Sequence, residues 1–313
     1  MTTYIITGAT GLIGGMLVDY LRKDKKNRLI LPVRNVMKAK DRFGSDLQLS
    51  FVEHDFSSKA QLAINEDVDY IVHAACPTAS RYMAESPVET IDTIVNGTST
   101  MLQVAKQSHV KGMVFLSSME IYGTLSGESP VDESMQGFVP LLNVRSSYPI
   151  AKRLAETLCH SYAKEYAVPV CIARLTQTFG PGVDVASDMR VFAQFARCAR
   201  DGKDIVLNTE GRTMRMYLHT ADAIDAILLL LTKGTMGEAY NVANKETYCS
   251  IRGMAEFVKE NFCPSIKVLV RKNENHFYLP EMHLPLSTER MERLGWKPQY
   301  GLKEMFQSVI KGV

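Results

Sequence analysis

The sequence lacks the features that mark a membrane-spanning, secreted or nucleic-acid-binding protein. Its longest unbroken apolar run, Ala226–Leu231, is far shorter than the about 20 residues that cross a bilayer. The apolar stretch Tyr4–Ile6 is too short for a secretory signal and is followed at once by glycines. The net charge is only +2 and no long basic run is present. We therefore expect a cytoplasmic protein whose partners include neither nucleic acid nor a membrane.

Paired cysteines are also missing. None of the cysteines forms a C-x-x-C pair, which argues against a zinc site or a redox-active dithiol. Several lie in apolar stretches that are typical of strand or helix interiors. The sequence thus predicts packed, reduced thiols and no metal site; the cysteines are Cys76, Cys159, Cys171, Cys198, Cys249 and Cys263.

Short apolar runs alternate with segments of helical spacing over the first half of the chain. The runs are rich in valine and isoleucine and fall at 4–7, 28–33, 48–54, 70–74, 112–117 and 168–174. Helical spacing of apolar residues is found at 12–21, 91–105 and 151–162. This alternation, with strands that are apolar throughout, predicts an α/β fold with a doubly wound parallel sheet covered on both faces.

The pattern changes after Arg174, and Gly180-Pro181-Gly182 interrupts it. Beyond this point we expect helices at 189–200, 221–231, 286–294 and 302–310, and strands near 205–207, 214–218 and 239–242. No internal repeat or low-complexity linker separates the two halves. The sequence predicts a larger domain at 1–175, to which 214–244 returns, and a smaller, interwoven C-terminal lobe at 176–313.

A glycine turn joins the first predicted strand to the first predicted helix, with the spacing G-x-x-G-x-x-G. Glycines let the backbone turn tightly and let phosphate oxygens approach N–H groups, and the helix N-terminus favours an anion. We therefore predict that the turn binds the diphosphate of a nicotinamide dinucleotide. The residues assigned to this role are Gly8, Thr10, Gly11, Leu12, Ile13 and Gly14.

The residues after the next two strands are assigned to the adenosine half of such a cofactor. Arg34 stands where a carboxylate would bind the ribose of NAD. A guanidinium suits a 2′-phosphate, so Arg34 favours NADP, and a solvated arginine with NAD held by the backbone is the alternative. Asp55 and Phe56 are assigned to the adenine edge, with a helix cap for the segment from Ser57 as the alternative.

A serine at a strand end and a Tyr-x-x-x-Lys pair follow in order. Ser118 ends the fifth strand, and Tyr148 and Lys152 are four residues apart, which puts them on one face of a helix. An ammonium about 4 Å from a phenol, at an effective dielectric of about 20, contributes about 4 kcal/mol, or about three pKa units. We therefore predict that Lys152 lowers the pKa of Tyr148 toward neutral pH. Tyr148 then takes a proton from an alcohol that Ser118 holds.

Together these motifs resemble the extended short-chain dehydrogenases/reductases, within the NAD-dependent epimerase/dehydratase family that modifies nucleotide sugars. The resemblance implies a Rossmann fold and covers nearly the whole chain. Besides the glycine turn and Tyr148–Lys152, it rests on His73-Ala74-Ala75, Asn96-Gly97-Thr98, Ser117–Gly123, Arg174–Pro181, Arg215–Asp222 and Leu294–Pro298.

The resemblance implies roles for single residues. Ser118, Tyr148 and Lys152 form its catalytic triad, and Tyr148 and Lys152 also contact the cofactor, as do Ala74 and Ala75. Asn96 is implied to support the active-site backbone beside the cofactor. Arg215 and Gln177 are implied to bind the nucleotide diphosphate, although many relatives carry Asn at the Gln177 position.

The implied chemistry starts when Tyr148 removes a proton from a sugar hydroxyl, usually at C4, while hydride passes to the nicotinamide. The 4,6-dehydratases carry Asp-Glu in place of Met119-Glu120, so dehydration is disfavoured. UDP-glucuronate decarboxylases carry Ser-Glu there, and that branch is the one the chain looks most like. Glu120 is therefore a catalytic candidate, with a structural acceptor of backbone N–H groups as the alternative. Epimerisation or decarboxylation of a nucleotide sugar is the expected function.

Two other functions remain open at this point. One is an NADPH-dependent reductase of a small carbonyl compound, which Arg34 suits. The other is an NAD(P)-binding sensor without catalysis. The resemblance also implies a homodimer formed through the helices that contain Asn96 and Tyr148.

Overall fold

The computed structural model describes residues 1–125, 129–271 and 281–311. The chain forms two compact units. Unit 1 comprises Met1–Thr124, Gln136–Leu175 and Ile224–Tyr240, and unit 2 comprises Leu125–Met135, Thr176–Ala223 and Asn241–Val313. No helix in the described ranges has both the length and the apolar composition needed to cross a membrane.

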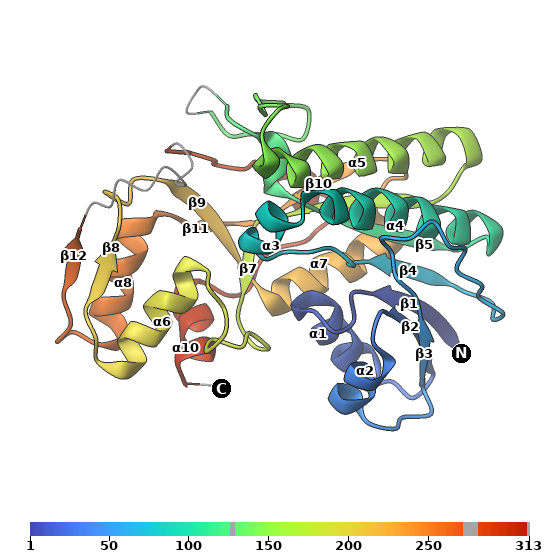
Figure 1. The fold of residues 1–313 in the computed structure, drawn as a ribbon, viewed down its shortest axis with the longest axis horizontal. Coiled ribbons are helices and arrows are strands. Elements are labelled where there is room, and N and C mark those ends of the chain that lie inside the picture. The colour runs from blue at the N-terminus through green and yellow to red at the C-terminus, as the bar shows by residue number, and fades with distance from the viewer. Residues whose placement is uncertain (126–128, 272–280, 312–313) are drawn as a thin grey trace. The chain divides into compact units, whose positions relative to one another are not determined.

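A seven-stranded sheet is the centre of the fold (Figure 1), and its strand order is β10-β6-β5-β4-β1-β2-β3. Its strands are β1 (Thr2–Thr7), β2 (Asn27–Val33), β3 (Leu49–Glu53), β4 (Tyr70–His73), β5 (Gly112–Ser118), β6 (Val170–Leu175) and β10 (Ala239–Val242). The pairs among β1 to β6 are all parallel. The order 3-2-1-4-5-6 is that of the Rossmann fold, which confirms the predicted fold class.

Helices cover both faces of this sheet. On one face α4 (Pro87–Gln107) and α5 (Ser147–Tyr166) lie side by side, and α1 (Leu12–Leu21), α2 (Val36–Phe43) and α7 (Thr220–Lys233) lie on the other (Figure 1). A Cβ at Gly112 of β5 would lie 2.3 Å from the Leu231 oxygen of α7, so this helix packs directly on the strand. Burial on both sides explains why β5 is buried in every residue except Ser118.

Unit 2 contains two small sheets. In the first, β9 (Met214–His219) pairs in parallel with β7 (Gln177–Phe179) and antiparallel with β11 (Asn244–Ser250). In the second, β8 (Ile205–Leu207) pairs in parallel with β12 (Val268–Val270). The helices are α6 (Val191–Asp201), α8 (Ile251–Phe262), α9 (Glu289–Arg293) and α10 (Leu302–Lys311). Of these, α6, α8 and α10 pack around an aromatic core in which the rings of Phe179 and Phe192 stack 4.1 Å apart.

The predicted helix at 286–294 is wrong in its first part, because α9 begins only at Glu289. Leu286 instead forms an isolated parallel bridge with Val131, and the Val131 N–H donates to the Pro285 oxygen at 2.7 Å. These backbone contacts with a segment far away in sequence outweigh the helical spacing of residues 286–288.

Candidate active site

The glycine turn lies at the carboxyl ends of β1 and β4, where the strand order reverses (Figure 1). Gly8 has a φ of 67°, and a Cβ there would lie 2.6 Å from the Ala74 oxygen. A Cβ at Gly14 would lie 2.3 Å from the Gly8 oxygen, so α1 starts directly against the turn. Gly11 is the exposed N-cap of α1, and no side chain caps this helix start. The turn therefore fits the diphosphate of a dinucleotide, which binds to uncapped N–H groups at such a helix start.

Thr7 fixes the backbone on the other side of this crevice. Its hydroxyl accepts hydrogen bonds from the Ala74 and Ala75 N–H groups, both at 3.0 Å, and lies 2.8 Å from His73 Nδ1. The hydrogen bond between this hydroxyl and the His73 ring joins the ends of β1 and β4. Burial and the Lys152 charge lower the pKa of His73 to about 3, so the ring stays neutral. Thr7 was not among the site residues predicted from the sequence. Its one signal there is its position, as a polar residue directly before the glycines.

The residues assigned to adenosine meet at one corner of unit 1. Arg34 and Asp55 follow β2 and β3 and are both exposed. The Ser57 N–H and hydroxyl, which both donate to Asp55, and to a smaller extent the Arg34 charge lower the pKa of Asp55. Phe56 is buried against α4, where a Cβ at Gly97 would lie 3.1 Å from it.

Asp55 and Asn96 both form hydrogen bonds with Ser57. Asp55 caps no helix, because it accepts the Ser57 N–H in a turn at 2.9 Å. Asn96 Nδ2 donates to the Ser57 oxygen at 2.9 Å. It thus holds the segment after β3, at the adenosine corner, and this is the backbone that it supports in the structure.

Arg42 is a second residue that sequence reasoning missed. From α2, its Nη1 donates to the oxygens of Thr10 and Gly11 at 2.9 and 3.1 Å. A Cβ at Gly15 would overlap this guanidinium, at 1.9 Å from Nη2. No pattern in the sequence links a polar helix to a turn some thirty residues earlier, as the separations of 32 and 31 positions show. Arg42 adds positive charge beside the turn.

Ser118, Tyr148 and Lys152 come together at the carboxyl end of β5. Lys152 Nζ donates to the Leu116 oxygen at 2.6 Å and lies 4.5 Å from the centre of the Phe115 ring. The Ser118 hydroxyl lies near enough to the Tyr148 phenol to lower the pKa of that phenol. Ser118 Oγ also accepts the Glu120 N–H at 3.2 Å, in the short 3₁₀ helix η1 (Met119–Tyr122). A hydroxyl, a phenol and an ammonium so arranged can bind an alcohol and remove its proton.

The predicted effect of Lys152 on Tyr148 is wrong for the protein chain by itself. Burial raises the pKa of Tyr148 well above its ordinary value, and Cys76 and Glu120 raise it further, while the Ser118 hydrogen bond acts in the opposite direction. Lys152 Nζ lies 5.8 Å from the centre of the Tyr148 ring. Residue spacing predicts the shared helix face but not the depth of burial, so desolvation of the phenolate outweighs the Coulomb attraction.

The two residues assigned to the nucleotide diphosphate lie in unit 2, on paired strands. Gln177 of β7 is in register with Tyr217 of β9, and Arg215 stands two residues earlier on β9. Arg215 Nε is buried and has no hydrogen-bond partner within the described residues. A buried, unpaired guanidinium N–H is costly unless an acceptor reaches it, so this position fits an anionic ligand.

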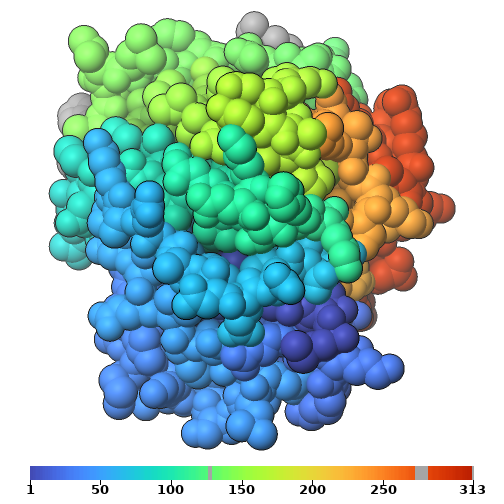
Figure 2. Space-filling model, turned by 90° about the vertical axis from the view of Figure 1, so that its right-hand side faces the viewer, coloured from blue at the N-terminus to red at the C-terminus, as the bar shows by residue number. Residues whose placement is uncertain are grey.

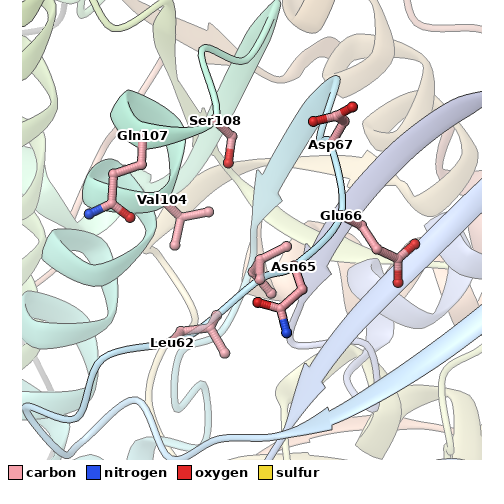
Figure 3. A pocket seen from close by; sticks show the side chains of 8 residues that line it. Leu62, Asn65, Glu66, Asp67, Val104, Gln107 and Ser108 are labelled. Atoms are coloured by element: carbon pink, nitrogen blue, oxygen red, sulfur yellow. The ribbon is translucent and has the colours of Figure 1, made fainter.

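A separate hollow of about 340 Å³ lies in unit 1 (Figure 3). The segment 62–67 and the end of α4, with Val104, Gln107 and Ser108, line it. Both segments precede strands, β4 and β5, and so lie at the amino ends of the sheet. Ligands of such sheets bind at the carboxyl ends, which argues against this hollow as the reaction site.

Comparisons with known proteins agree with the geometry. A family model described as the NAD dependent epimerase/dehydratase family matches residues 4–243. UDP-glucuronic acid decarboxylase 5 from Arabidopsis thaliana is 31% identical over 303 residues, which cover 96% of this chain and 86% of that protein.

Two solved structures share the fold over the whole length. UDP-glucose 4-epimerase from Thermotoga maritima, with UDP-glucose, has a TM-score of 0.83 at 20% identity and covers 99% of this chain and 98% of its own. UDP-glucuronic acid 4-epimerase from Bacillus cereus, in complex with UDP-glucuronic acid and NAD, has a TM-score of 0.80 at 20% identity, with coverages of 99% and 98%. By the match of the family model over most of its length, the chain belongs to the NAD dependent epimerase/dehydratase family.

Proposed function

We propose that the protein is an enzyme that converts a nucleotide-diphosphate sugar through a transient 4-keto intermediate, and that it decarboxylates UDP-glucuronate. The observation that carries the proposal is the cluster of Ser118, Tyr148 and Lys152 at the carboxyl end of β5, on the same sheet edge as the glycine turn. The names of the curated relatives support the substrate, since those at 30 and 31% identity are UDP-glucuronic acid decarboxylases.

Tyr148 acts as the general base in this account. Ser118 and Tyr148 bind the C4 hydroxyl, and Tyr148 takes its proton as C4 is oxidised. When bound, the oxidised nicotinamide supplies the hydride acceptor and a positive charge. The Lys152 ammonium, 5.8 Å from the centre of the phenol ring, also favours the phenolate. Because burial raises the pKa of Tyr148 in the chain alone, the phenolate that takes the proton would depend on these two positive charges.

Decarboxylation then follows from the structure of the oxidised sugar. A ketone at C4 makes the carboxylate on C5 that of a β-keto acid, so the electrons of the broken C–C bond pass into an enolate as CO₂ leaves. Glu120 follows Ser118 in η1, and its charge acts on Tyr148. We propose that Glu120 serves the step after CO₂ leaves, in which the enolate takes a proton at C5. Met119 beside it is buried and has no acidic group, which disfavours loss of water.

The cofactor is a dinucleotide held by the glycine turn, with Arg34 selecting NADP over NAD. Solved structures of similar fold contain NAD or NADPH. Arg34 is exposed at the end of β2, close enough to Asp55 to lower the pKa of that carboxyl. A guanidinium in this position suits a 2′-phosphate.

A homodimer through α4 and α5 completes the proposal. The two helices lie side by side at the surface (Figures 1 and 2). Val88 of α4 is 69% exposed, and Leu154 of α5 is 47% exposed. Light scattering should give the mass of a dimer for the protein and that of a monomer for Val88→Asp combined with Leu154→Asp. A monomeric wild type would contradict this part.

The test of function is a panel of UDP-, dTDP-, GDP-, CDP- and ADP-sugars analysed by mass and NMR. Loss of CO₂ from UDP-glucuronate is the expected result. An unchanged mass with a new sugar configuration would replace decarboxylation by epimerisation within the same account. No conversion of any nucleotide sugar would overturn the proposal.

The alternative of an NADPH-dependent reductase has one observation in its favour, namely Arg34. A reductase consumes one cofactor for each product, whereas the proposed enzyme regenerates its cofactor. The ratio of cofactor consumed to product formed in the same assay therefore distinguishes a reductase from the proposed enzyme.

A further inference from the structure

A buried ionic cluster lies directly behind the reaction site. Glu156 stands on α5 four residues after Lys152 and eight after Tyr148, so the three share one helix face. Its carboxylate accepts Arg174 Nη2 at 2.7 Å, and the two side chains are each only 10% exposed. The Ser117 hydroxyl donates to the same carboxylate at 2.5 Å. The cluster thus ties the end of β5, β6 and α5 together.

The same cluster extends to η1, the segment that carries Glu120. Arg174 Nη1 donates to the Tyr122 hydroxyl at 2.9 Å, and its guanidinium lies 5.1 Å from the centre of the fully buried Tyr122 ring. From α5, Arg153 Nε donates to the Ile121 oxygen at 2.7 Å. Side chains of α5 and β6 therefore hold η1 from behind.

A segment of this kind needs such support. A 3₁₀ helix of four residues has few and poorly aligned hydrogen bonds, so it does not fix its own side chains. A buried ion pair adds little net stability compared with apolar residues, and its better-supported role is to specify one arrangement. The partners of this pair are Ser117 and Tyr122, which flank Ser118 and Glu120 in the chain.

We infer that Glu156, Arg174 and Tyr122 are positioning residues that set Ser118 and Glu120 relative to Tyr148. The inference rests on the proposed function for its kinetic part only. Glu156 stands on the same helix as Tyr148, and Arg174 of β6 joins it to Tyr122 of η1, so the cluster connects the helix of the base to the segment that carries Glu120. None of the three touches the substrate in this account.

Tyr122→Phe tests this with the smallest change, since it removes one hydroxyl and leaves the ring. Its matched control is Tyr240→Phe, which also removes a buried hydroxyl, one that accepts the Thr235 N–H at 2.8 Å. We expect Tyr122→Phe to lower kcat about tenfold, with KM changed less than about twofold, because misplaced reacting groups slow the chemical step. Tyr240→Phe should leave both unchanged. An unchanged kcat in Tyr122→Phe would overturn the inference.

A double-mutant cycle with Glu120→Gln separates positioning from a general loss of stability. If Tyr122 acts through Glu120, the double variant is no slower than Glu120→Gln alone. If the two losses multiply, Tyr122 does not act through Glu120, and the positioning of Glu120 by Tyr122 is refuted.

Hydrogen exchange gives a readout that needs no substrate. The amides of residues 119–123 should exchange faster in Tyr122→Phe than in wild type, while those of α5 stay as protected as in Tyr240→Phe. Unchanged exchange at 119–123 would refute the positioning role. If wild type converts no nucleotide sugar, the proposed function fails, and the exchange result still decides this inference.

Discussion

Gly14→Ala is the sharpest test of the cofactor turn, because the structure fixes what an added methyl group meets. The new Cβ would lie 2.3 Å from the Gly8 oxygen, 2.7 Å from the Gly8 carbonyl carbon and 3.0 Å from the Ala9 nitrogen. All three atoms belong to the backbone, so no side chain can rotate away. To regain an ordinary contact of about 3.4 Å, the start of α1 must move by about 1 Å.

That displacement has two measurable consequences. Overpacking of this kind costs about 1–3 kcal/mol of the free energy of unfolding. The moved helix start also loses at least one hydrogen bond to the diphosphate, and a bond to a charged group contributes about 1.5–3 kcal/mol. We therefore expect the Kd for NAD and NADP to rise about 10- to 100-fold.

Calorimetric titration with both dinucleotides, together with thermal denaturation, measures the two effects. Gly301→Ala is the matched control, because its Cβ would meet only the Glu304 carboxylate at 3.4 Å, an ordinary contact. It should change neither quantity. A Gly14→Ala variant that is destabilised but binds both dinucleotides with unchanged Kd would refute the assignment of the turn to the diphosphate.

Three further predictions follow from single residues. Tyr148→Phe should lower turnover by about 10²–10⁴-fold, because it removes the general base, yet it should bind cofactor and cost only about 1 kcal/mol of stability; single-turnover kinetics check this, and surviving turnover would contradict the mechanism. Arg34→Glu should weaken NADP binding about tenfold or more and leave NAD binding unchanged, as titration with each would reveal; equal effects on both would remove Arg34 from 2′-phosphate recognition. The pKa of His73 is about 3 in the folded protein and about 6.5 when unfolded, so the unfolded chain alone takes up this proton as the pH falls below 6.5. Stability is therefore lost in that direction, by about 2 kcal/mol between pH 6.5 and pH 5 from this residue. Urea unfolding at the two pH values should show a smaller loss in His73→Gln, and an equal loss would be contrary to the account.

The central sheet could be predicted from the sequence because parallel strands buried on both faces must be apolar throughout. The predicted strands of β1 to β6 agree with the structure within two residues at each end. Two helices that were not predicted, α2 and α8, lie where few residues are buried or where a capping residue determines the start of the helix. α2 buries only Ala39 and Phe43 amid charged residues, and Asn35 caps it by accepting the Lys38 N–H. α8 begins at a Ser250 cap.

The candidate site could be predicted only where it depends on local spacing. The shared face of Tyr148 and Lys152 follows from four residues on a helix. The contacts of Thr7 with Ala75, of Arg42 with Thr10 and of Ser117 with Glu156 join residues 68, 32 and 39 positions apart. Such contacts depend on strand order and burial, and the same is true of the pKa of Tyr148.

The central claim is that a bound dinucleotide is reduced and reoxidised within each turnover of a nucleotide sugar. Absorbance at 340 nm, followed after UDP-glucuronate is mixed with the cofactor-loaded protein, measures this directly. We predict that the absorbance rises within the first turnover and returns to its starting value once substrate is exhausted, while CO₂ and a UDP-pentose form. No transient with UDP-glucuronate bound, or a loss of reduced cofactor that matches product one for one, would contradict the account.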